Sequence, residues 1–118
     1  KFNIDMYIGI GGGPEGVLAA SALSCMGGQM QTRLVFQNAT EEKRAKDLGI
    51  KDLKKKYNIE DMVKGDVIFC ATGVTDGDFV KGIKITGDTF KSETLVLHKS
   101  SKINKVIKNQ INKWIYPR

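Results

Sequence analysis

The sequence has no uninterrupted run of about 18 apolar residues, the length that an α-helix needs to cross a membrane, and no signal-peptide pattern at its start. We therefore expect a cytoplasmic protein with no membrane partner. Cysteine is scarce as well: Cys25 lies in an apolar helical stretch and Cys70 in an apolar strand-like one. Each is expected to be a free buried thiol, so we expect neither a disulfide nor a zinc site.

Histidine occurs once, as His98, at the end of a strand-like run and beside lysines. Because no second histidine or neighbouring carboxylate accompanies it in the sequence, the pattern favours a strand-end residue over a catalyst. A nucleotide P-loop is excluded, since no Gly-Lys-Ser/Thr follows the glycine-rich stretch.

Acidic residues are outnumbered by basic ones, which gives a net charge of +6 over 118 residues. The lysines in the middle of the chain are interspersed with acids, and they concentrate only near residues 99 to 113. A solvated surface explains most of them, although nucleic-acid binding remains an alternative. With 41% apolar residues, the chain is expected to be a single domain over residues 1–118 with one core.

Glycine is abundant, and the stretch I-G-I-G-G-G-P-E-G-V from Ile8 to Val17 is typical of a strand, a tight turn and a helix start. Pro14 suits the first helical position, where its missing N–H costs nothing. This places Glu15 in the first turn of the helix, with its carboxylate near exposed N–H groups. A carboxylate in this position is well placed to meet a cation.

Two interpretations of this stretch compete. The spacing Gly11-x-Gly13-x-x-Gly16 fits a dinucleotide-binding fingerprint. That fingerprint also needs an acidic residue at the end of the next strand, where this chain has Gln37 and Asn38. Glu15 would in addition place a negative charge beside the pyrophosphate. The dinucleotide-binding module therefore stays a minor alternative.

Apolar periodicity and turn residues predict the order of the elements. We expect an interior strand, a largely buried helix, a short strand, a charged helix capped by Thr40 and a further helical stretch. Then come a strand buried on both faces, which favours an α/β sheet, and two antiparallel strands around a turn. In order, the segments are Ile4–Ile10, Pro14–Met26, Thr32–Gln37, the helix from Thr40, Lys51–Tyr57, Asp66–Ala71, and the strands at Ile83–Ile85 and Thr94–His98. The tail from Lys102 suits either a helix or a strand.

A polar loop follows the sixth of these segments, with the sequence T-G-V-T-D-G-D from Thr72 to Asp78. Ligands in open α/β sheets collect outside the carboxyl ends of strands, so this loop is expected to lie beside the Gly9–Gly16 turn. Asp76 and Asp78 flank a glycine and offer oxygen ligands for a hard cation. Asp-Gly-Asp is also a common turn, and composition alone favours the turn.

Two motifs together resemble class II fructose-1,6-bisphosphatases, some of which also act on sedoheptulose 1,7-bisphosphate. The first is G-I-G-G-G-P-E-G-V with its small-residue helix, followed by Gly27-Gly28-Gln29-Met30 and Arg33-Leu34; the second is A-T-G-V-T-D-G-D, from Ala71 to Asp78. The resemblance covers most of residues 4 to about 98 and concerns the C-terminal part of the family only. It implies an α/β fold, a layered mixed sheet with helices like that of the inositol-monophosphatase-like sugar phosphatases. It also implies that the chain is part of a longer phosphatase, whose N-terminal metal-binding part is absent.

The same resemblance implies a reaction and a site. The family hydrolyses the 1-phosphate of fructose 1,6-bisphosphate with Mn²⁺ or Mg²⁺, a step of gluconeogenesis. Its metal-binding glutamate falls on Glu15 and its substrate-contacting glycine on Gly12, while Thr75, Asp76 and Asp78 are further substrate-binding candidates. No catalytic residue is assigned. Gly13 and Gly16 are expected to serve the turn and helix packing. With most metal ligands outside this chain, we expect it to be inactive alone, to need the N-terminal part as a partner, and to be able to form a homo-oligomer.

Overall fold

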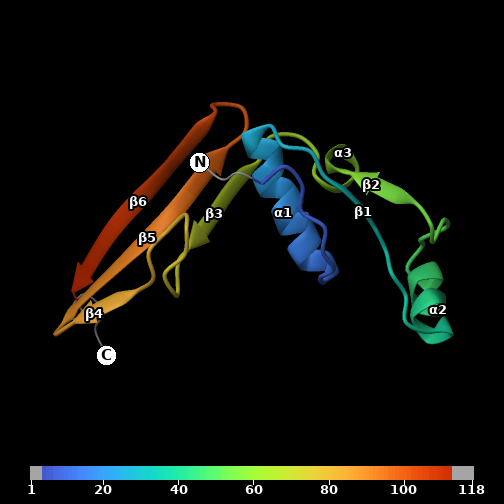
Figure 1. The fold of residues 1–118 in the computed structure, drawn as a ribbon, viewed down its shortest axis with the longest axis horizontal. Helices are drawn as coiled ribbons and strands as arrows, with labels where there is room; N and C mark the ends of the chain where they lie inside the picture. The colour runs from blue at the N-terminus through green and yellow to red at the C-terminus, as the bar shows by residue number, and fades with distance from the viewer. Residues whose placement is uncertain (1–3, 113–118) are drawn as a thin grey trace.

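The computed structural model describes residues 4–112, in which helices and strands alternate up to the first strand of the main sheet and three further strands follow it (Figure 1). The expected mixture of helices and sheet is confirmed. The helices are α1 (Gly13–Met26), α2 (Ala39–Asp47) and α3 (Ile59–Met62), and the strands are β1 (Gln31–Arg33), β2 (Lys56–Asn58), β3 (Ile68–Thr72), β4 (Lys84–Thr86), β5 (Thr89–His98) and β6 (Ile103–Asn112).

The main sheet is built around β5, which has a partner along each edge. β6 pairs with the whole of β5, from Thr89↔Asn112 to His98↔Ile103, while the other edge is shared by β3 and β4. All of these pairs are antiparallel, and so is the separate β1–β2 pair. The predicted hairpin around Gly87, which has a φ of 56°, is confirmed as β4 and β5. The ambiguous tail is a strand up to Asn112, and its last residues lie outside the described part.

The predicted burial of the Asp66–Ala71 strand is wrong. As β3 it alternates between exposed and half-buried residues, with Ile68 68% exposed. The reason is that β3 is an outer strand whose one face is covered by α1, as in antiparallel sheets that face water on one side. Cys70 is exposed and Cys25 is half-buried, so both thiols are free as expected but neither is buried.

Helix α1 forms where the sequence predicts it. Pro14 occupies its first turn, and Gly27 ends it in the left-handed conformation, with a φ of 72° and its N–H donating to the carbonyl of Leu23. The helix packs against β3, β5 and α3, but Ala20 is its one fully buried residue. The expectation of a largely buried helix is therefore wrong, because the sheet covers only one side.

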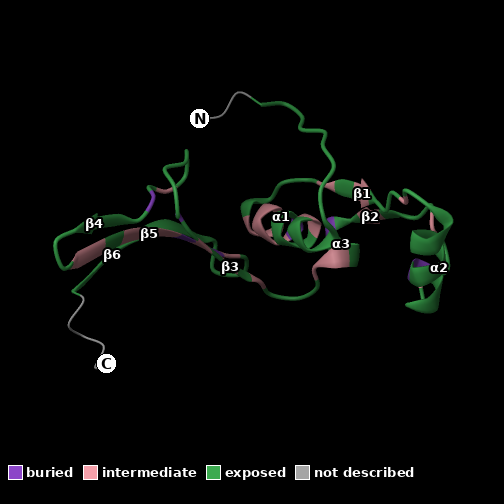
Figure 2. Cartoon of the chain, turned by 90° about the horizontal axis from the view of Figure 1, so that it is seen from below, coloured by how far each residue is buried: buried purple, intermediate pink, exposed green. Residues whose placement is uncertain are grey.

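The arrangement of the elements is open. The Cα radius of gyration is 18.5 Å, whereas a compact domain of this length has about 13.5 Å. Figures 1 and 2 show the β3–β6 sheet at one end, α1 and α3 in the middle, and α2 with β1 and β2 at the other end. Within residues 4–112 the buried apolar residues are few: Ala20, Ala45, Ile59, Leu95 and Leu97.

Three local predictions in the first half are also corrected. The Ile4–Ile10 segment forms no strand, and Tyr7 and Ile8 are 86% and 85% exposed, because no described strand lies beside it. The Lys51–Tyr57 stretch is a turn leading into β2, not a helix, and the Thr32–Gln37 strand is confined to β1. The N-cap of α2 is Asn38 and not Thr40, since the Asn38 side chain accepts the Glu41 N–H at 3.0 Å.

The main sheet has two unlike faces. Leu95 and Leu97 are buried on the side that α1 covers. The opposite side carries isoleucines from β3, β4 and β6, which we call the isoleucine face: Ile68, Ile85, Ile103, Ile107 and Ile111. All five are exposed. No described helix is long and apolar enough to span a membrane.

Candidate functional site

The turn before α1 brings together the two residues that carry the main site prediction. Gly12 is the extended N-cap residue of the helix, and the Gly16 N–H donates to its carbonyl at 3.0 Å. Glu15 lies in the first turn, and its carboxylate folds back over Gly12. A Cβ atom on Gly12 would collide with Oε2 of Glu15. Glycine at this position therefore leaves the space that the Glu15 carboxylate occupies.

Three other glycines of this turn have open space beside them, whereas a Cβ atom on Gly9 would lie 2.6 Å from the Tyr7 hydroxyl oxygen. A Cβ atom on Gly11, Gly13 or Gly16 would meet nothing within 4 Å. Gly16 takes part in the turn through its N–H bond to the Gly12 carbonyl, but no neighbour within residues 4–112 outside the helix backbone requires glycine at position 13 or 16. The Glu15 carboxylate, likewise, has no hydrogen-bonding or ionic partner among these residues and is exposed.

The second predicted segment forms a loop, residues 73–82, that closes on itself. The Gly82 N–H donates to Oδ1 of Asp76 at 2.9 Å, and the Ile83 N–H donates to the carbonyl of Val74 at 3.2 Å. The Asp76 pKa is lowered chiefly by the Gly82 hydrogen bond, with smaller contributions from Lys81 and Lys84. Asp76 thus acts as the turn residue that its composition favours.

Gly73 and Gly82 make this closure sterically possible. A Cβ atom on Gly73 would collide with the carbonyl oxygen of Lys81, and one on Gly82 would lie 2.7 Å from the carbonyl oxygen of Val74. Asp78 and Thr75, the other candidates in the loop, are exposed. These residues were predicted to belong to a site, but the closure was not predicted, because it depends on the approach of backbone segments about eight residues apart.

The two predicted segments do not lie side by side. In Figures 1 and 2 the glycine turn leads into α1, while the loop after β3 projects from the sheet at a separate place. The expectation required Ile4–Ile10 and β3 to be neighbouring parallel strands. Ile4–Ile10 is not a strand, and β3 pairs antiparallel, so their carboxyl ends do not meet. Within residues 4–112, no three histidine, cysteine or acidic side chains gather to hold a metal ion.

His98 has a carboxylate partner in the structure, although no acidic residue lies near it in the sequence. Its Nε2 lies 2.7 Å from Oδ2 of Asp66, and its Nδ1 lies 2.6 Å from the Ser101 hydroxyl. The Ser100 hydroxyl donates to the same Asp66 oxygen at 2.8 Å. Hydrogen bonds from Ser100 first, and then from His98, lower the pKa of Asp66 to about 2. The cluster joins Asp66, two residues before β3, to the end of β5 and the β5–β6 turn, so His98 is a strand-end residue as predicted.

No signal in the sequence could have found this cluster, since 32 residues separate Asp66 from His98.

The arrangement of the strands contradicts the dinucleotide interpretation. It needs a strand before the glycine turn and a parallel strand after α1. The first is missing, and β1 pairs antiparallel with β2.

Comparison with known proteins identifies relatives of this chain. The family described as bacterial fructose-1,6-bisphosphatase, glpX-encoded, matches residues 1–111. The chain belongs to this family. The resemblance predicted from the two glycine motifs is therefore confirmed, and the match extends through β6.

Individual bisphosphatases of this family agree. The chain is 39% identical over 118 residues to the class 2 fructose-1,6-bisphosphatase of Haemophilus influenzae, a match that covers 87% of this chain and 35% of that protein. It is 39% identical over 112 residues to the D-fructose 1,6-bisphosphatase class 2/sedoheptulose 1,7-bisphosphatase of a Synechococcus species, covering 84% of this chain and 32% of that one. The protein of the same name from Trichodesmium erythraeum is 33% identical over 118 residues, covering 89% and 34%. The chain thus spans about a third of the length of these relatives.

Proposed function

We propose that this chain is part of a metal-dependent sugar bisphosphatase that hydrolyses fructose 1,6-bisphosphate to fructose 6-phosphate and phosphate. The reaction belongs to gluconeogenesis and takes place in the cytoplasm. The observation that carries the proposal is the Glu15 carboxylate folded over Gly12 at the start of α1, in a chain of a bisphosphatase family.

Glu15 fits the role of one ligand to Mn²⁺ or Mg²⁺. Hard cations take carboxylate oxygens, and this carboxylate is exposed and free of ionic partners within residues 4–112. When bound, the ion would supply charge stabilisation at the phosphoryl oxygens and a lowered pKa of the attacking water. One carboxylate cannot hold such an ion by itself. The remaining ligands come from the rest of the enzyme, which is the partner we propose.

Gly12 contributes to the same site through its missing side chain. The absence of a Cβ atom allows the carboxylate of Glu15 to lie over the helix start and leaves the backbone open to a sugar phosphate. The Gly13 and Glu15 N–H groups precede the first intrahelical hydrogen bond, which Gly16 donates. With a divalent cation on Glu15 to offset its negative charge, these N–H groups would be available to phosphoryl oxygens. Thr75, Asp76 and Asp78 stay candidates for substrate contact, with Asp76 already engaged by Gly82.

The first test uses the chain alone. We expect no phosphate release from fructose 1,6-bisphosphate with Mn²⁺ above that of the Glu15→Ala variant, because a single carboxylate is too little to bind the ion. Metal-dependent release well above this control would show that the chain holds more of the site. Titration of NAD, NADP and a mixed oligonucleotide at about 0.15 M salt tests the alternatives. Micromolar binding of any of them would displace the proposal.

The second test uses the complete enzyme with the Glu15→Gln substitution. Glutamine keeps the size of the side chain. The free energy of unfolding should therefore fall by no more than the helix-dipole contribution, about 0.3–1 kcal/mol. Turnover should fall sharply and the Mn²⁺ requirement should change, since an amide cannot replace an anionic ligand. Glu42→Gln is the matched control, because Glu42 also lies in the first turn of an exposed helix, α2. Unchanged turnover and metal dependence would make Glu15 a helix-start residue only.

A further inference from the structure

Two lysines lie directly opposite each other in the sheet, an arrangement that costs stability unless an anion compensates it. Lys84 of β4 pairs with Lys91 of β5, so both side chains leave the same face. No described acidic side chain forms an ion pair with either of them. The next strand adds Gln110, an uncharged hydrogen-bonding side chain, opposite Lys91.

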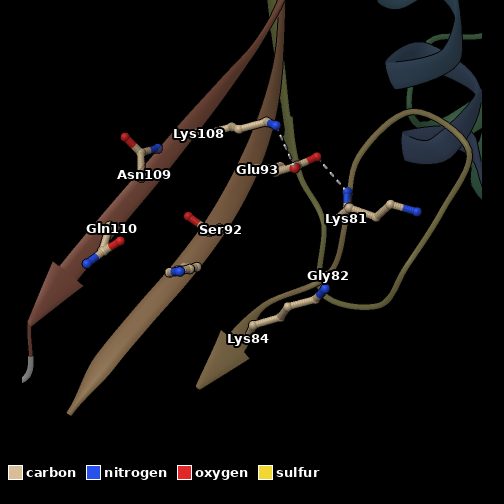
Figure 3. Close-up of a pocket in the computed structure, with 9 residues that line it drawn as sticks. Lys81, Gly82, Lys84, Ser92, Glu93, Lys108, Asn109 and Gln110 are labelled. Carbon is tan, nitrogen blue, oxygen red and sulfur yellow. Dashed lines mark hydrogen bonds and ion pairs between the residues drawn. The ribbon is translucent and has the colours of Figure 1, made fainter. Parts of the chain in front are cut away.

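The next cross-strand pair on the same face, two residues along β5, adds another lysine and one acidic residue. That acidic side chain already has two partners. Glu93 pairs with Lys108 across β5 and β6, and its Oε1 lies 3.8 Å from the Lys108 Nζ. Its Oε2 accepts the Lys81 backbone N–H at 2.9 Å. Figure 3 shows Glu93 between these two partners, with the Lys81 side chain extending away from it. The described lining of this region thus holds four lysines and one carboxylate, Glu93. The Asp76 carboxylate, outside the lining, interacts electrostatically with Lys81 and Lys84, so positive charge remains in excess.

These residues line one groove, with a volume of about 500 Å³, between the 73–82 loop and the β4–β6 end of the sheet. We call it the lysine groove. Its volume lies within the range of small-molecule sites, about 300–1,000 Å³. The loop beside it is fixed by its Gly73 and Gly82 contacts and by the Asp76 hydrogen bond, so the groove is formed before any ligand arrives.

We propose that the lysine groove binds a phosphate monoester of a small polar molecule. The dianionic phosphate would lie between Lys84 and Lys91 and relieve their repulsion, while Glu93 and Gln110 provide an acceptor and an amide for hydroxyl groups. Among the described residues, the lining holds no arginine and no aromatic side chain, which are the groups that favour polynucleotides. This site uses none of the residues at the start of α1, so the proposal does not depend on the proposed function.

The first experiment titrates the ¹⁵N-labelled chain with a hexose 6-phosphate and, separately, with inorganic phosphate, at constant ionic strength set with chloride. We expect saturable shifts of the amides of β4, β5 and residues 108–110. The double variant Lys84→Gln/Lys91→Gln should weaken binding at least tenfold, whereas Lys43→Gln/Lys46→Gln on α2 removes the same charge and should leave it unchanged. Shifts from inorganic phosphate alone would identify a free-anion site and overturn the ester. Shifts spread over all lysines, or no saturation, would overturn the site.

A second measurement separates binding from a structural role. In the absence of phosphate, Lys84→Gln should raise the melting temperature, because it removes a like-charge pair. With phosphate present, the same variant should lose the ligand-induced rise that the unmodified chain shows. A variant that melts lower without ligand, or that keeps the full rise with it, contradicts the proposal. Tighter binding of a single-stranded oligonucleotide than of the hexose phosphate would assign the groove to nucleic acid instead.

Discussion

Replacing Gly82 by alanine should open the loop that follows β3. The new Cβ atom would lie 2.7 Å from the carbonyl oxygen of Val74 and 2.8 Å from the Cα of Thr75, and both atoms belong to the backbone and cannot rotate away. Overpacking of this kind costs about 1–3 kcal/mol. If the shift also breaks the Gly82–Asp76 hydrogen bond, it adds about 1 kcal/mol. We therefore expect a local destabilisation of roughly 2–4 kcal/mol.

Amide hydrogen exchange at Gly82 and Ile83 measures this opening directly, since their N–H groups donate to Asp76 and Val74. A loss of about 2 kcal/mol corresponds to an approximately 30-fold fall in protection. Gly77→Ala in the same loop is the control, because the nearest atom to its Cβ is 3.7 Å away, an ordinary contact. Equal protection in the two variants would refute the steric argument.

Three further predictions concern stability. Asn38→Ala should cost about 0.5–2 kcal/mol and reduce helicity by circular dichroism, because the Glu41 N–H loses its cap; an unchanged spectrum and denaturation midpoint would contradict this. The Asp66 pKa is lowered from 3.8 to about 2, so its ionised form stabilises the folded chain above about pH 4 and this contribution is lost as the pH falls towards 2. Asp66→Asn should therefore flatten the dependence of urea denaturation on pH in that window, and an equally steep dependence would rule out the pairing. Leu97→Ala should cost about 2–5 kcal/mol, since Leu97 is 1% exposed, whereas Ile107→Ala on the isoleucine face should cost less than half as much; equal costs would mean that this face is buried in solution.

Local signals in the sequence predicted the elements that depend on local chemistry. Pro14 and Gly27 mark both ends of α1, and the Gly87 turn gives the β4–β5 hairpin. The Gly12–Glu15 pair was also predictable, because its two members lie within one turn of chain. These features need no knowledge of distant neighbours.

The predictions that were wrong or ambiguous concern segments whose structure depends on partners distant in the sequence or outside the described part. Apolar content predicts that Ile4–Ile10 is buried, but burial needs a neighbour that residues 4–112 do not provide. The tail was ambiguous for a geometric reason: a spacing of four, as in Ile103, Ile107 and Ile111, places side chains on one face of a helix and equally on one face of a strand. The register with β5 decides the question, and register is a tertiary property.

The long β5–β6 hairpin has a consequence for the order in which this chain folds. Ten cross-strand pairs follow from a turn of only four residues, 99–102, so the entropy of loop closure is small and a hairpin of this kind forms within about 1–10 μs. Helix α1 and β3 are much further apart in the sequence. For example, the Cys25 thiol of α1 donates to the carbonyl of Val67, just before β3, and these two residues are 42 positions apart. We therefore expect α1 to dock onto a hairpin that already exists, with the site at its first turn completed last.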